Sequence, residues 1–359
     1  MNRSRRSDHA VSIVNPDGHV IGLDIGATAV RAAILAPDRG ESDGLMTVED
    51  LGQAPLPPGV VVDGVLQDAP TLTRVLTQLW REHDFGCRHV IIGVSNPQVV
   101  VRPMQMPNLP PEQLARALPF RAREVIALEL DKAVLDFRPL GPSPDGRDLV
   151  DGLLVAAPRA PVLAAVRAVE AAGLRIVRVD LASFAALRST AADHGVAEAV
   201  VDIGAQMTNI VIHHLGVPRV VRALNRGGEQ LTERLVERTG ASAAEAEILK
   251  RESGVHESEN ETSMILSTTI RPLVSDIRSS IQYFTTTNPD APLERVSLTG
   301  GGAELPGLAE MLTEDVGLPC TLVSPLRNVL SRIASPEGRH EAPATATAVS
   351  VGLAMGAAA

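Results

Sequence analysis

The sequence predicts an α/β protein of two domains, and three observations support this prediction. The chain has 359 residues, which exceeds the length at which one hydrophobic core usually splits into domains. Strand-like and helix-like patterns alternate along its first part, which is the order expected of a mixed α/β sheet. One strand–turn–strand pattern also occurs twice, at residues 20–35 and 199–212, each time as an apolar run, Asp-Ile-Gly-Ala, a Thr and a second apolar run.

Composition narrows the classes of function. The formal net charge is −10, so the chain has no general attraction for nucleic acid or for an anionic membrane. Aromatic residues make up 2%, which disfavours a surface for stacking bases, and no apolar run is long enough to span a membrane. Cys87 and Cys320 lack metal-ligand spacing and are expected to be buried, reduced thiols of a cytoplasmic protein. Residues 1–19 lack the apolar core of a signal peptide and are expected to form a disordered tail.

Helix and strand patterns continue through the first half of the chain. Residues 37–58 are rich in Gly, Pro and Asp and predict a loop or an edge strand. Apolar residues at helical spacing predict a helix over 71–83. Pro110 suits the start of a helix, whereas Pro119 is expected to break or kink that helix. Further helices are expected at 110–117, 161–172 and 180–194, and strands at 89–94, 99–106, 133–137, 149–157 and 174–179.

The second half is predominantly helical outside its own repeat. Residues 251–262 are polar and acidic, so we expect a surface loop there. Pro272 lies inside the amphipathic stretch 263–285 and is expected to kink that helix or mark its boundary. Residues 295–308 indicate a strand, a triple-glycine turn and the start of a helix. Further helices are expected at 230–239, 243–250 and 347–358.

The first repeat carries the residue types of a phosphate-binding hairpin. Gly26 permits a tight turn that brings backbone N–H groups close to an anion, and Thr28 adds a hydroxyl donor. Asp24 would repel phosphate, so its natural role is to hold Mg²⁺ through water, since Mg²⁺ keeps much of its hydration shell. Arg31 is expected to be a solvated strand residue rather than a phosphate sensor. Such turns are common, so this hairpin alone is equally consistent with an ordinary turn.

The second repeat and a third motif favour a nucleotide site. Asp202, Gly204 and Thr208 repeat the residue types of the first hairpin, and Asn209 follows them. Residues 300–302 are all glycine and would let a nucleoside lie against bare backbone at a strand-to-helix turn. A lone triple glycine is a weak signal, but the three motifs in this order are specific.

The order and spacing of these motifs resemble those of the actin, heat-shock chaperone and sugar-kinase superfamily. Within it, the chain resembles the PilM family of type IV pilus assembly proteins over nearly all of its length after residue 19. The matching segments are VIGLDIGATAVR, LPFRAREVIALELDKAVLDFRPLG, LLVAAPR, VVDIGAQMTNIVI, LVSDIRSSIQYF and SLTGGGAELPGL. The second of these, at 118–141, is the most specific, because it lies in the insertion by which PilM and the cell-division protein FtsA differ from actin and from kinases.

The resemblance implies an actin-like ATPase fold of two lobes, each with a mixed β-sheet and flanking helices. Lobe 1 would comprise residues 20–195, as subdomain 1A with an FtsA/PilM-type 1C insertion near 88–174. Lobe 2 would comprise residues 196–330, as subdomain 2A with 2B near 231–285. Residues 331–359 would then return to subdomain 1A.

The resemblance also implies ATP and Mg²⁺ between the lobes. Asp24 and Asp202 would hold the Mg²⁺ through water. The residues expected at the nucleotide phosphates are Asp24, Gly26, Ala27, Thr28, Asp202, Gly204, Ala205, Thr208 and Asn209. Those expected at the adenosine are Gly300, Gly301, Gly302 and Glu304.

A membrane-protein partner is a further implication of the resemblance. PilM proteins bind the short cytoplasmic N-terminus of a bitopic inner-membrane protein, PilN, in a groove near subdomains 1A and 1C. The chain would thereby link a PilN-like protein to the motor ATPase or platform protein of a pilus or related secretion machine. It is therefore expected to be cytoplasmic and peripheral to the inner membrane through its partners, with no bound nucleic acid and no direct membrane insertion.

Hydrolysis of ATP would require a group that orients or activates water opposite the γ-phosphate. PilM relatives commonly carry a Glu where this chain has Ala182. Asp180 and Ser183 are the polar residues nearby, and Asp180 is expected to cap the following helix. We therefore expect ATP binding with weak or no turnover, and the sequence assigns no catalytic residue.

Two alternatives belong to the same superfamily. A small-molecule kinase should carry an added Asp as general base near its substrate site, and the sequence shows no such motif. An FtsA-like division filament usually ends in an amphipathic helix with basic residues for membrane binding. The last residues here, AVSVGLAMGAAA, contain no Lys or Arg, which disfavours direct membrane attachment.

Overall fold

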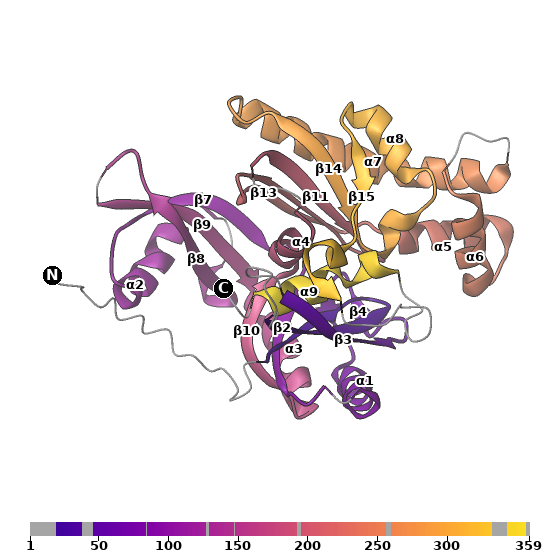
Figure 1. The fold of residues 1–359 in the computed structure, drawn as a ribbon, viewed down its shortest axis with the longest axis horizontal. Helices are drawn as coiled ribbons and strands as arrows, with labels where there is room; N and C mark the ends of the chain where they lie inside the picture. The colour runs from indigo at the N-terminus through magenta and orange to yellow at the C-terminus, as the bar shows by residue number, and fades with distance from the viewer. Residues whose placement is uncertain are drawn as a thin grey trace.

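Two lobes, each built on a mixed β-sheet, make up the protein, and a smaller three-stranded sheet projects to one side (Figure 1). The α/β class predicted from the sequence is confirmed. Residues 1–18 of the predicted tail lie outside the described residues, as do two parts of the C-terminal segment, 332–342 and 357–359. The computed structural model describes residues 19–37, 46–83, 85–126, 129–146, 148–191, 195–255, 260–331 and 343–356.

The first lobe is built on a six-stranded sheet in the order β10-β6-β1-β2-β3-β16. β1 pairs antiparallel with β2 and parallel with β6, so the first Asp-Ile-Gly-Ala turn lies at the end of central strands. The predicted loop or edge strand at 37–58 contains β3, near one edge of the sheet. The strands are β1 (Ile21–Ile25), β2 (Ala29–Pro37), β3 (Met46–Pro55), β6 (His89–Val94), β10 (Arg175–Leu181) and β16 (Leu330–Ser331).

Helices cover both faces of this sheet. Side chains of β1 alternate between the faces, as the strand period requires: Ile21 and Leu23 join the core under α1 and α3, whereas Gly22 faces α9. A Cβ at Gly22 would lie 2.0 Å from the carbonyl oxygen of Ser350, so only glycine permits this close approach of helix and sheet. The helices are α1 (Ala69–Glu82) and α3 (Arg159–Ala171) on one face, and α4 (Ala182–Thr190) and α9 (Ala348–Met355) on the other.

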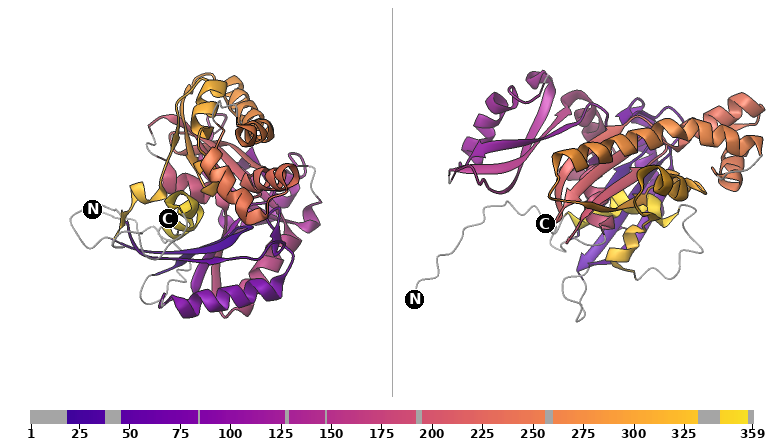
Figure 2. Two further views of the ribbon diagram at one scale, coloured as in Figure 1. Left: turned by 90° about the vertical axis from the view of Figure 1, so that its right-hand side faces the viewer. Right: turned by 90° about the horizontal axis from the view of Figure 1, so that it is seen from above.

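The second lobe repeats the central arrangement of the first. In its five-stranded sheet, β13-β12-β11-β14-β15, β11 pairs antiparallel with β12 and parallel with β14. Helix α4 packs between the two sheets, and Figure 2 shows the lobes one above the other in its left view. The strands are β11 (Ala197–Ile203), β12 (Thr208–His214), β13 (Val217–Leu224), β14 (Leu293–Thr299) and β15 (Cys320–Leu322). The helices are α5 (Gly228–Thr239), α6 (Ala243–Ser253), α7 (Glu261–Thr287) and α8 (Leu308–Val316), with short 3-10 turns at Gly301–Glu304, Pro325–Asn328 and Ala344–Thr347.

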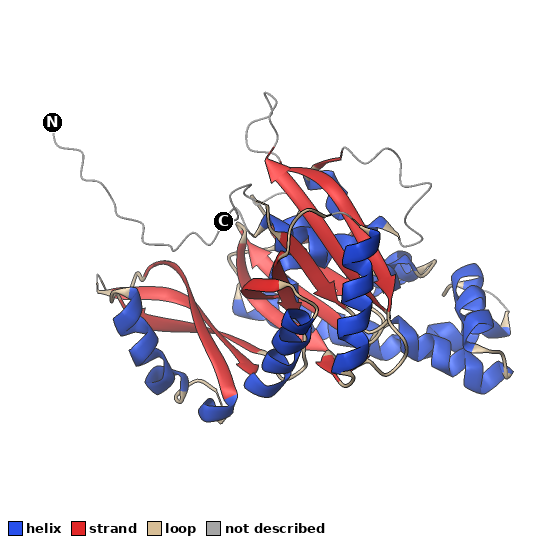
Figure 3. Cartoon of the chain, turned by 90° about the horizontal axis from the view of Figure 1, so that it is seen from below, coloured by secondary structure: helices blue, strands red, loops and turns tan. Residues whose placement is uncertain are grey.

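Two smaller units complete the chain. A three-stranded antiparallel sheet, β7-β9-β8, carries helix α2 and stands apart from the lobes in Figure 3. A two-stranded hairpin, β4-β5, lies between β3 and α1 in the sequence. Their elements are β4 (Val61–Val62), β5 (Val65–Leu66), β7 (Val100–Pro107), α2 (Pro111–Ala122), a 3-10 turn (Leu130–Lys132), β8 (Ala133–Pro142) and β9 (Leu149–Pro158).

One predicted helix start was wrong, and neither of the two prolines ends its helix. The helix expected from 180 begins at Ala182, because Asp180 is still paired with Gly93 as part of strand β10. Helices α2 and α7 run through Pro119 and Pro272 without ending there. Both prolines are exposed, so the carbonyl groups that lose a helical hydrogen bond lie on a solvent-facing side. No helix among the described residues is long and apolar enough to cross a membrane.

Candidate functional site

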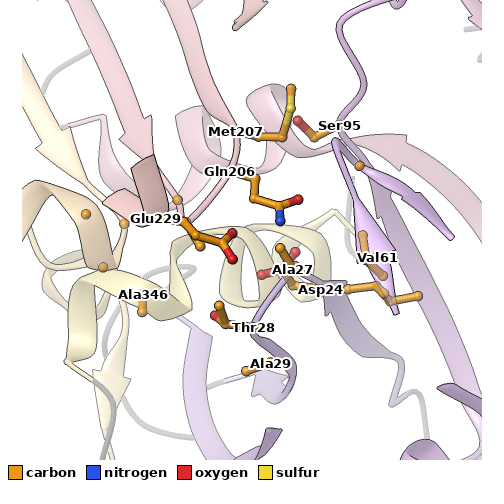
Figure 4. Close-up of a pocket in the computed structure, with 18 of the residues that line it drawn as sticks. Asp24, Ala27, Thr28, Ala29, Val61, Ser95, Gln206, Met207, Glu229 and Ala346 are labelled. Atoms are coloured by element: carbon orange, nitrogen blue, oxygen red, sulfur yellow. The ribbon is translucent and has the colours of Figure 1, made fainter. Parts of the chain in front are cut away.

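A cavity of about 1100 Å³ lies where the ends of the two central hairpins and the triple-glycine turn face one another (Figure 4). The structure brings twelve of the thirteen predicted site residues to its lining; the exception is Thr208. The twelve are Asp24, Gly26, Ala27, Thr28, Asp202, Gly204, Ala205, Asn209, Gly300, Gly301, Gly302 and Glu304.

The first hairpin presents a tight turn and an ion pair. The Gly26 N–H donates to the Ala29 carbonyl at 3.0 Å and closes the turn between β1 and β2. Arg31 lies two residues beyond Ala29, and its Nη1 is 3.9 Å from Oδ2 of Asp24. Its Nε donates to Oε1 of Gln53 on β3 at 2.9 Å. The side chain of Arg31 is only 17% exposed, so the prediction that it is a solvated strand residue was wrong.

The second hairpin closes in the same way but uses its polar residues differently. The Gly204 N–H donates to the Met207 carbonyl at 2.8 Å. Asn209 donates from Nδ2 to Oδ2 of Asp202 at 3.2 Å, which fixes that carboxylate toward the cavity. The hydroxyl of Thr208 is fully buried and donates to the Arg226 carbonyl at 2.8 Å. Thr208 therefore braces the chain that leads into α5 and does not reach the cavity.

Two buried carboxylates, Asp24 and Asp202, give the cavity its electrostatic character. Burial raises the pKa of Asp24 from 3.8 to about 6, with Arg31 opposing the rise and the negative charge of Asp202 adding to it. Burial also raises the pKa of Asp202, against the hydrogen bond from Asn209 and the charge of Arg31. Burial thus disfavours the charged forms of both carboxylates, and a bound cation would offset this by stabilising their negative charge. No group of three or more His, Cys, Asp or Glu that could hold a metal ion occurs among the described residues.

The triple-glycine turn depends on glycine at two of its positions. Gly300 has φ of +85°, and a Cβ there would lie 2.4 Å from the Ile203 carbonyl oxygen. A Cβ at Gly302 would lie 2.7 Å from Cγ2 of Ile203. The turn thus packs backbone directly against the second hairpin, while Glu304 accepts a hydrogen bond from the Thr345 hydroxyl at 2.7 Å. The result is a wall of bare backbone beside the cavity, which suits a flat ring system.

Helices α5 and α6 contribute cavity residues that the sequence analysis missed. Lys250 donates from Nζ to the Gly228 carbonyl at 3.1 Å and to Oγ1 of Thr232 at 2.9 Å. It also pairs with Glu247, and all four residues line the cavity. One signal was present in the sequence: Lys132 and Lys250 are the only lysines in a chain whose other cationic side chains are arginine.

The segment expected to supply a water-activating group offers none to the cavity. Ala182, the first residue of α4, lines it, whereas Asp180 and Ser183 do not. Asp180 forms an ion pair with Arg188 and accepts a hydrogen bond from the Leu181 N–H at 2.8 Å. The N-cap residue of α4 is Leu181, so the prediction that Asp180 caps the helix was wrong.

Comparison with known proteins establishes the family. A family model described as type IV pilus assembly protein PilM matches residues 22–358. The chain belongs to the PilM family. A solved PilM–PilN type IV pilus biogenesis complex is similar, with a TM-score of 0.82 at 27% identity, covering 96% of this chain and 100% of that chain. The PilM and actin-like fold predicted from the sequence are therefore confirmed, and the chain is an actin-like type IV pilus assembly protein.

More distant relatives agree with this fold. MreB5 of Spiroplasma citri bound to AMPPNP has a TM-score of 0.55 at 12% identity, covering 93% of this chain and 94% of that chain, which shows the fold alone. The cell division protein FtsA of Bacillus subtilis (strain 168) is 26% identical over 263 residues, which is 65% of this chain. That match spans 58% of FtsA, less than two thirds of its length.

Proposed function

We propose that this PilM-family protein is an ATP-binding scaffold that grips the cytoplasmic N-terminal peptide of a PilN-like inner-membrane protein and links it to the pilus motor. The observation that carries the proposal is that both Asp-Ile-Gly-Ala hairpins and the triple-glycine turn line one cavity. Such a cavity combines backbone N–H groups for phosphates with a bare wall for a nucleoside. In this proposal the protein is cytoplasmic and reaches the inner membrane only through its partners.

Each part of the cavity suits a part of ATP–Mg²⁺. The turns at Gly26–Thr28 and Gly204–Gln206 would hold the phosphates. Asp24 and Asp202 would hold Mg²⁺ through water, and the ion would offset the negative charge of the phosphates. The glycine turn and Lys250 would hold the nucleoside. Thr208 has no place in this set, because its hydroxyl is bonded to the Arg226 carbonyl.

We propose further that bound ATP turns over slowly or not at all. A hydrolase must orient the attacking water with a polar group. The position where relatives commonly carry a Glu is Ala182, which presents only a methyl group to the cavity. The neighbouring Asp180 is held in its ion pair with Arg188. In this proposal ATP is a ligand that sets the arrangement of the lobes, and its hydrolysis does not drive the function.

The partner proposal rests on the similarity to a solved PilM–PilN complex over nearly the whole chain. The proposed groove lies near the three-stranded sheet, whose segment 118–141 carries the most specific resemblance. This sheet and helix α4 share an apolar cluster that includes Leu153 and Phe184, so the sheet is seated on the first lobe. A motor ATPase or platform protein would be the second partner.

The subdomain division follows the same proposal. Sheet membership supports the two lobes: β1, β2, β3, β6 and β10 belong to the first sheet, β11 to β15 belong to the second, and β16 with α9 returns to the first. We propose the 1C insertion near 88–174 and the 2B insertion near 231–285, as the sequence predicts. Helix α9 is buried against the first sheet and α4, so α9 itself offers no face for a membrane.

Nucleotide binding is tested by calorimetric titration with ATP–Mg²⁺. The wild-type chain should bind, and Asp202→Ala should weaken binding by about tenfold or more, since a carboxylate that positions Mg²⁺ is lost. Asp290→Ala removes an exposed carboxylate away from the cavity and should leave the affinity unchanged. Phosphate release should be negligible without partners. Unchanged affinity in Asp202→Ala would count against the site, and rapid release would count against the scaffold role.

Partner binding is tested with a synthetic peptide that has the N-terminal sequence of a PilN-like protein from the same genome. Fluorescence anisotropy should show saturable binding of this peptide and none of a scrambled peptide. Equal binding of both peptides would overturn the partner assignment without touching the nucleotide site.

A further inference from the structure

Gln206, at the tip of the second hairpin, lines the cavity but was not among the residues that the sequence predicted there. Its side-chain oxygen Oε1 accepts a hydrogen bond from the backbone N–H of Asp63 at 2.9 Å. Asp63 belongs to the turn of the β4-β5 hairpin, far away in the sequence and on the first-lobe side of the cavity. The contact therefore crosses from one lobe to the other.

This contact fixes which way the Gln206 amide points. The oxygen and nitrogen of a side-chain amide lie on opposite sides, and only the oxygen can accept from the N–H of Asp63. Nε2 must therefore point away from Asp63. Figure 4 shows this nitrogen directed into the cavity, toward Ala27 and Asp24. Within the described part of the chain, no group accepts a hydrogen bond from Nε2.

The Asp63 donor is itself held firmly. Asp63 and Gly64 have φ of +52° and +72°, as in the tight two-residue hairpin turn favoured by Asp-Gly. A Cβ at Gly64 would lie 1.8 Å from the carbonyl oxygen of Ser95, so the turn is pressed against the end of β6. The Ser95 hydroxyl in turn donates to Oδ1 of Asn209 at 2.7 Å, a second contact between the lobes. The orientation of Gln206 is thus set by the first lobe.

The position of Gln206 in the cavity indicates which part of a bound nucleotide its side chain would contact. Ala346 lies at one end of the cavity, and Val61 and Ser95 lie at the other (Figure 4). The glycine turn lies at the Ala346 end, because an added Cβ at Gly301 would lie 3.9 Å from Cβ of Ala346, and this is the end proposed for the nucleoside. Gln206, at the tip of the second hairpin, lies between Ala27 of the first hairpin and Ser95 (Figure 4). The group of a nucleoside triphosphate farthest from its base is the terminal phosphate. A neutral amide N–H can donate to this phosphate, whereas the negative charge of a carboxylate at the same place would be repelled by it.

We propose that Gln206 donates from Nε2 to the terminal phosphate and is the side chain by which this protein distinguishes a nucleoside triphosphate from a diphosphate. This inference rests on the proposed nucleotide binding. It adds a specificity residue to the site and gives the β4-β5 hairpin a role, because Asp63 holds the donor in place. A Gln206 that only bridges the lobes would affect both nucleotides equally.

Two substitutions at one position separate these roles. Gln206→Glu keeps the oxygen that accepts from Asp63 but replaces the donor with a negative charge. Gln206→Met removes both the donor and the acceptor at similar size. Gln67→Glu is the matched control. Gln67 directly follows the β4-β5 hairpin that carries Asp63, is exposed and does not line the cavity. Thermal unfolding without nucleotide verifies that each variant is folded.

The measurement is the ratio of the dissociation constants for ADP and ATP, both with Mg²⁺, by calorimetric titration. The wild type should bind ATP more tightly than ADP. Gln206→Glu should weaken ATP binding by about tenfold or more while changing ADP binding by less than about threefold, as expected for loss of a hydrogen bond to a charged group. Gln206→Met should shift the ratio in the same direction by less, and Gln67→Glu should keep the wild-type ratio.

Contrary outcomes are distinguishable. A wild type that binds no nucleotide would refute the proposed function and this inference together. A wild type that binds ATP, with the ratio unchanged in Gln206→Glu or equally changed in Gln67→Glu, would refute this inference alone. Parallel weakening of ATP and ADP by Gln206→Met, with no effect of Gln206→Glu, would show that the residue only bridges the lobes.

Discussion

The ammonium nitrogen of Lys250 on α6 lies 3.1 Å from the carbonyl oxygen of Gly228 at the start of α5. The same ammonium group bonds Thr232 and pairs with Glu247, and only 13% of the Lys250 side chain is exposed. One cation thereby ties two helices together at the nucleoside end of the cavity. Its burial distinguishes it from the other lysine of the chain, Lys132, whose side chain is 71% exposed in a pair with Glu129.

Lys250→Met should lower the free energy of unfolding by about 1–3 kcal/mol, because the Gly228 carbonyl and the Glu247 carboxylate lose a largely buried donor. The matched change Lys132→Met removes an exposed ion pair and should alter stability by less than about 0.5 kcal/mol. Urea unfolding followed by circular dichroism measures both. Equal losses in the two variants would show that the burial of Lys250 adds nothing.

Gly300→Ala should destabilise the protein more than a simple change of backbone conformation does. Gly300 has φ of +85° and ψ of +156°, a conformation that would cost an alanine about 1–3 kcal/mol, and the added Cβ would also meet the Ile203 carbonyl. Gly240→Ala is the control, because Gly240 has φ of +71° and an added Cβ would meet nothing within 4 Å. Thermal unfolding should place Gly300→Ala clearly below Gly240→Ala. Equal midpoints would contradict the close packing of the glycine turn.

Stability should fall in acid through a buried carboxylate at the other end of the second sheet. Burial would raise the pKa of Glu198, but hydrogen bonds from His213 and Ser297 and the charge of Arg295 outweigh it and lower that pKa below 4.5. The unfolded chain then binds the proton more readily than the folded one, so the stabilisation is present above pH 4.5 and is lost as pH falls below it. The stability difference between wild type and Glu198→Gln should shrink from pH 7 to pH 4. A difference independent of pH would refute this.

The hairpin turns could be predicted from the sequence because their chemistry is local. Asp24, Gly26 and Thr28 fall within five consecutive positions, and the strand–turn–strand pattern places them at one end of a sheet. The repeat at Asp202 and Gly204 then indicates that two such ends face each other. The pattern does not determine where each polar side chain points. Thr208 was therefore assigned to phosphate, although its hydroxyl donates a hydrogen bond to the Arg226 carbonyl.

The parts that escaped prediction depend on contacts between distant segments. Gln206 and Asp63 are 143 positions apart, and nothing near either residue signals their hydrogen bond. Arg31 appeared solvent-facing because its partner Gln53 belongs to a strand whose pairing with β2 is visible only in the fold. Asp180 resembled a helix cap because a strand that ends directly at a helix has the same polar-then-apolar pattern as a cap.

Helix α4 lies between the two sheets, with Ala185 and Ala186 in one core with Ile91 of the first sheet and Val200 of the second. On its other side a Cβ at Gly352 of α9 would lie 1.8 Å from the Ala185 carbonyl oxygen, so the two helices touch backbone to backbone. This close packing of α4 leaves no room for the two lobes to slide relative to each other there. Any widening of the cavity that preserves this core would therefore have to be a rotation of the lobes about α4. The displacement would be greatest at the part of the cavity farthest from α4, beyond Gln206 and Asp63.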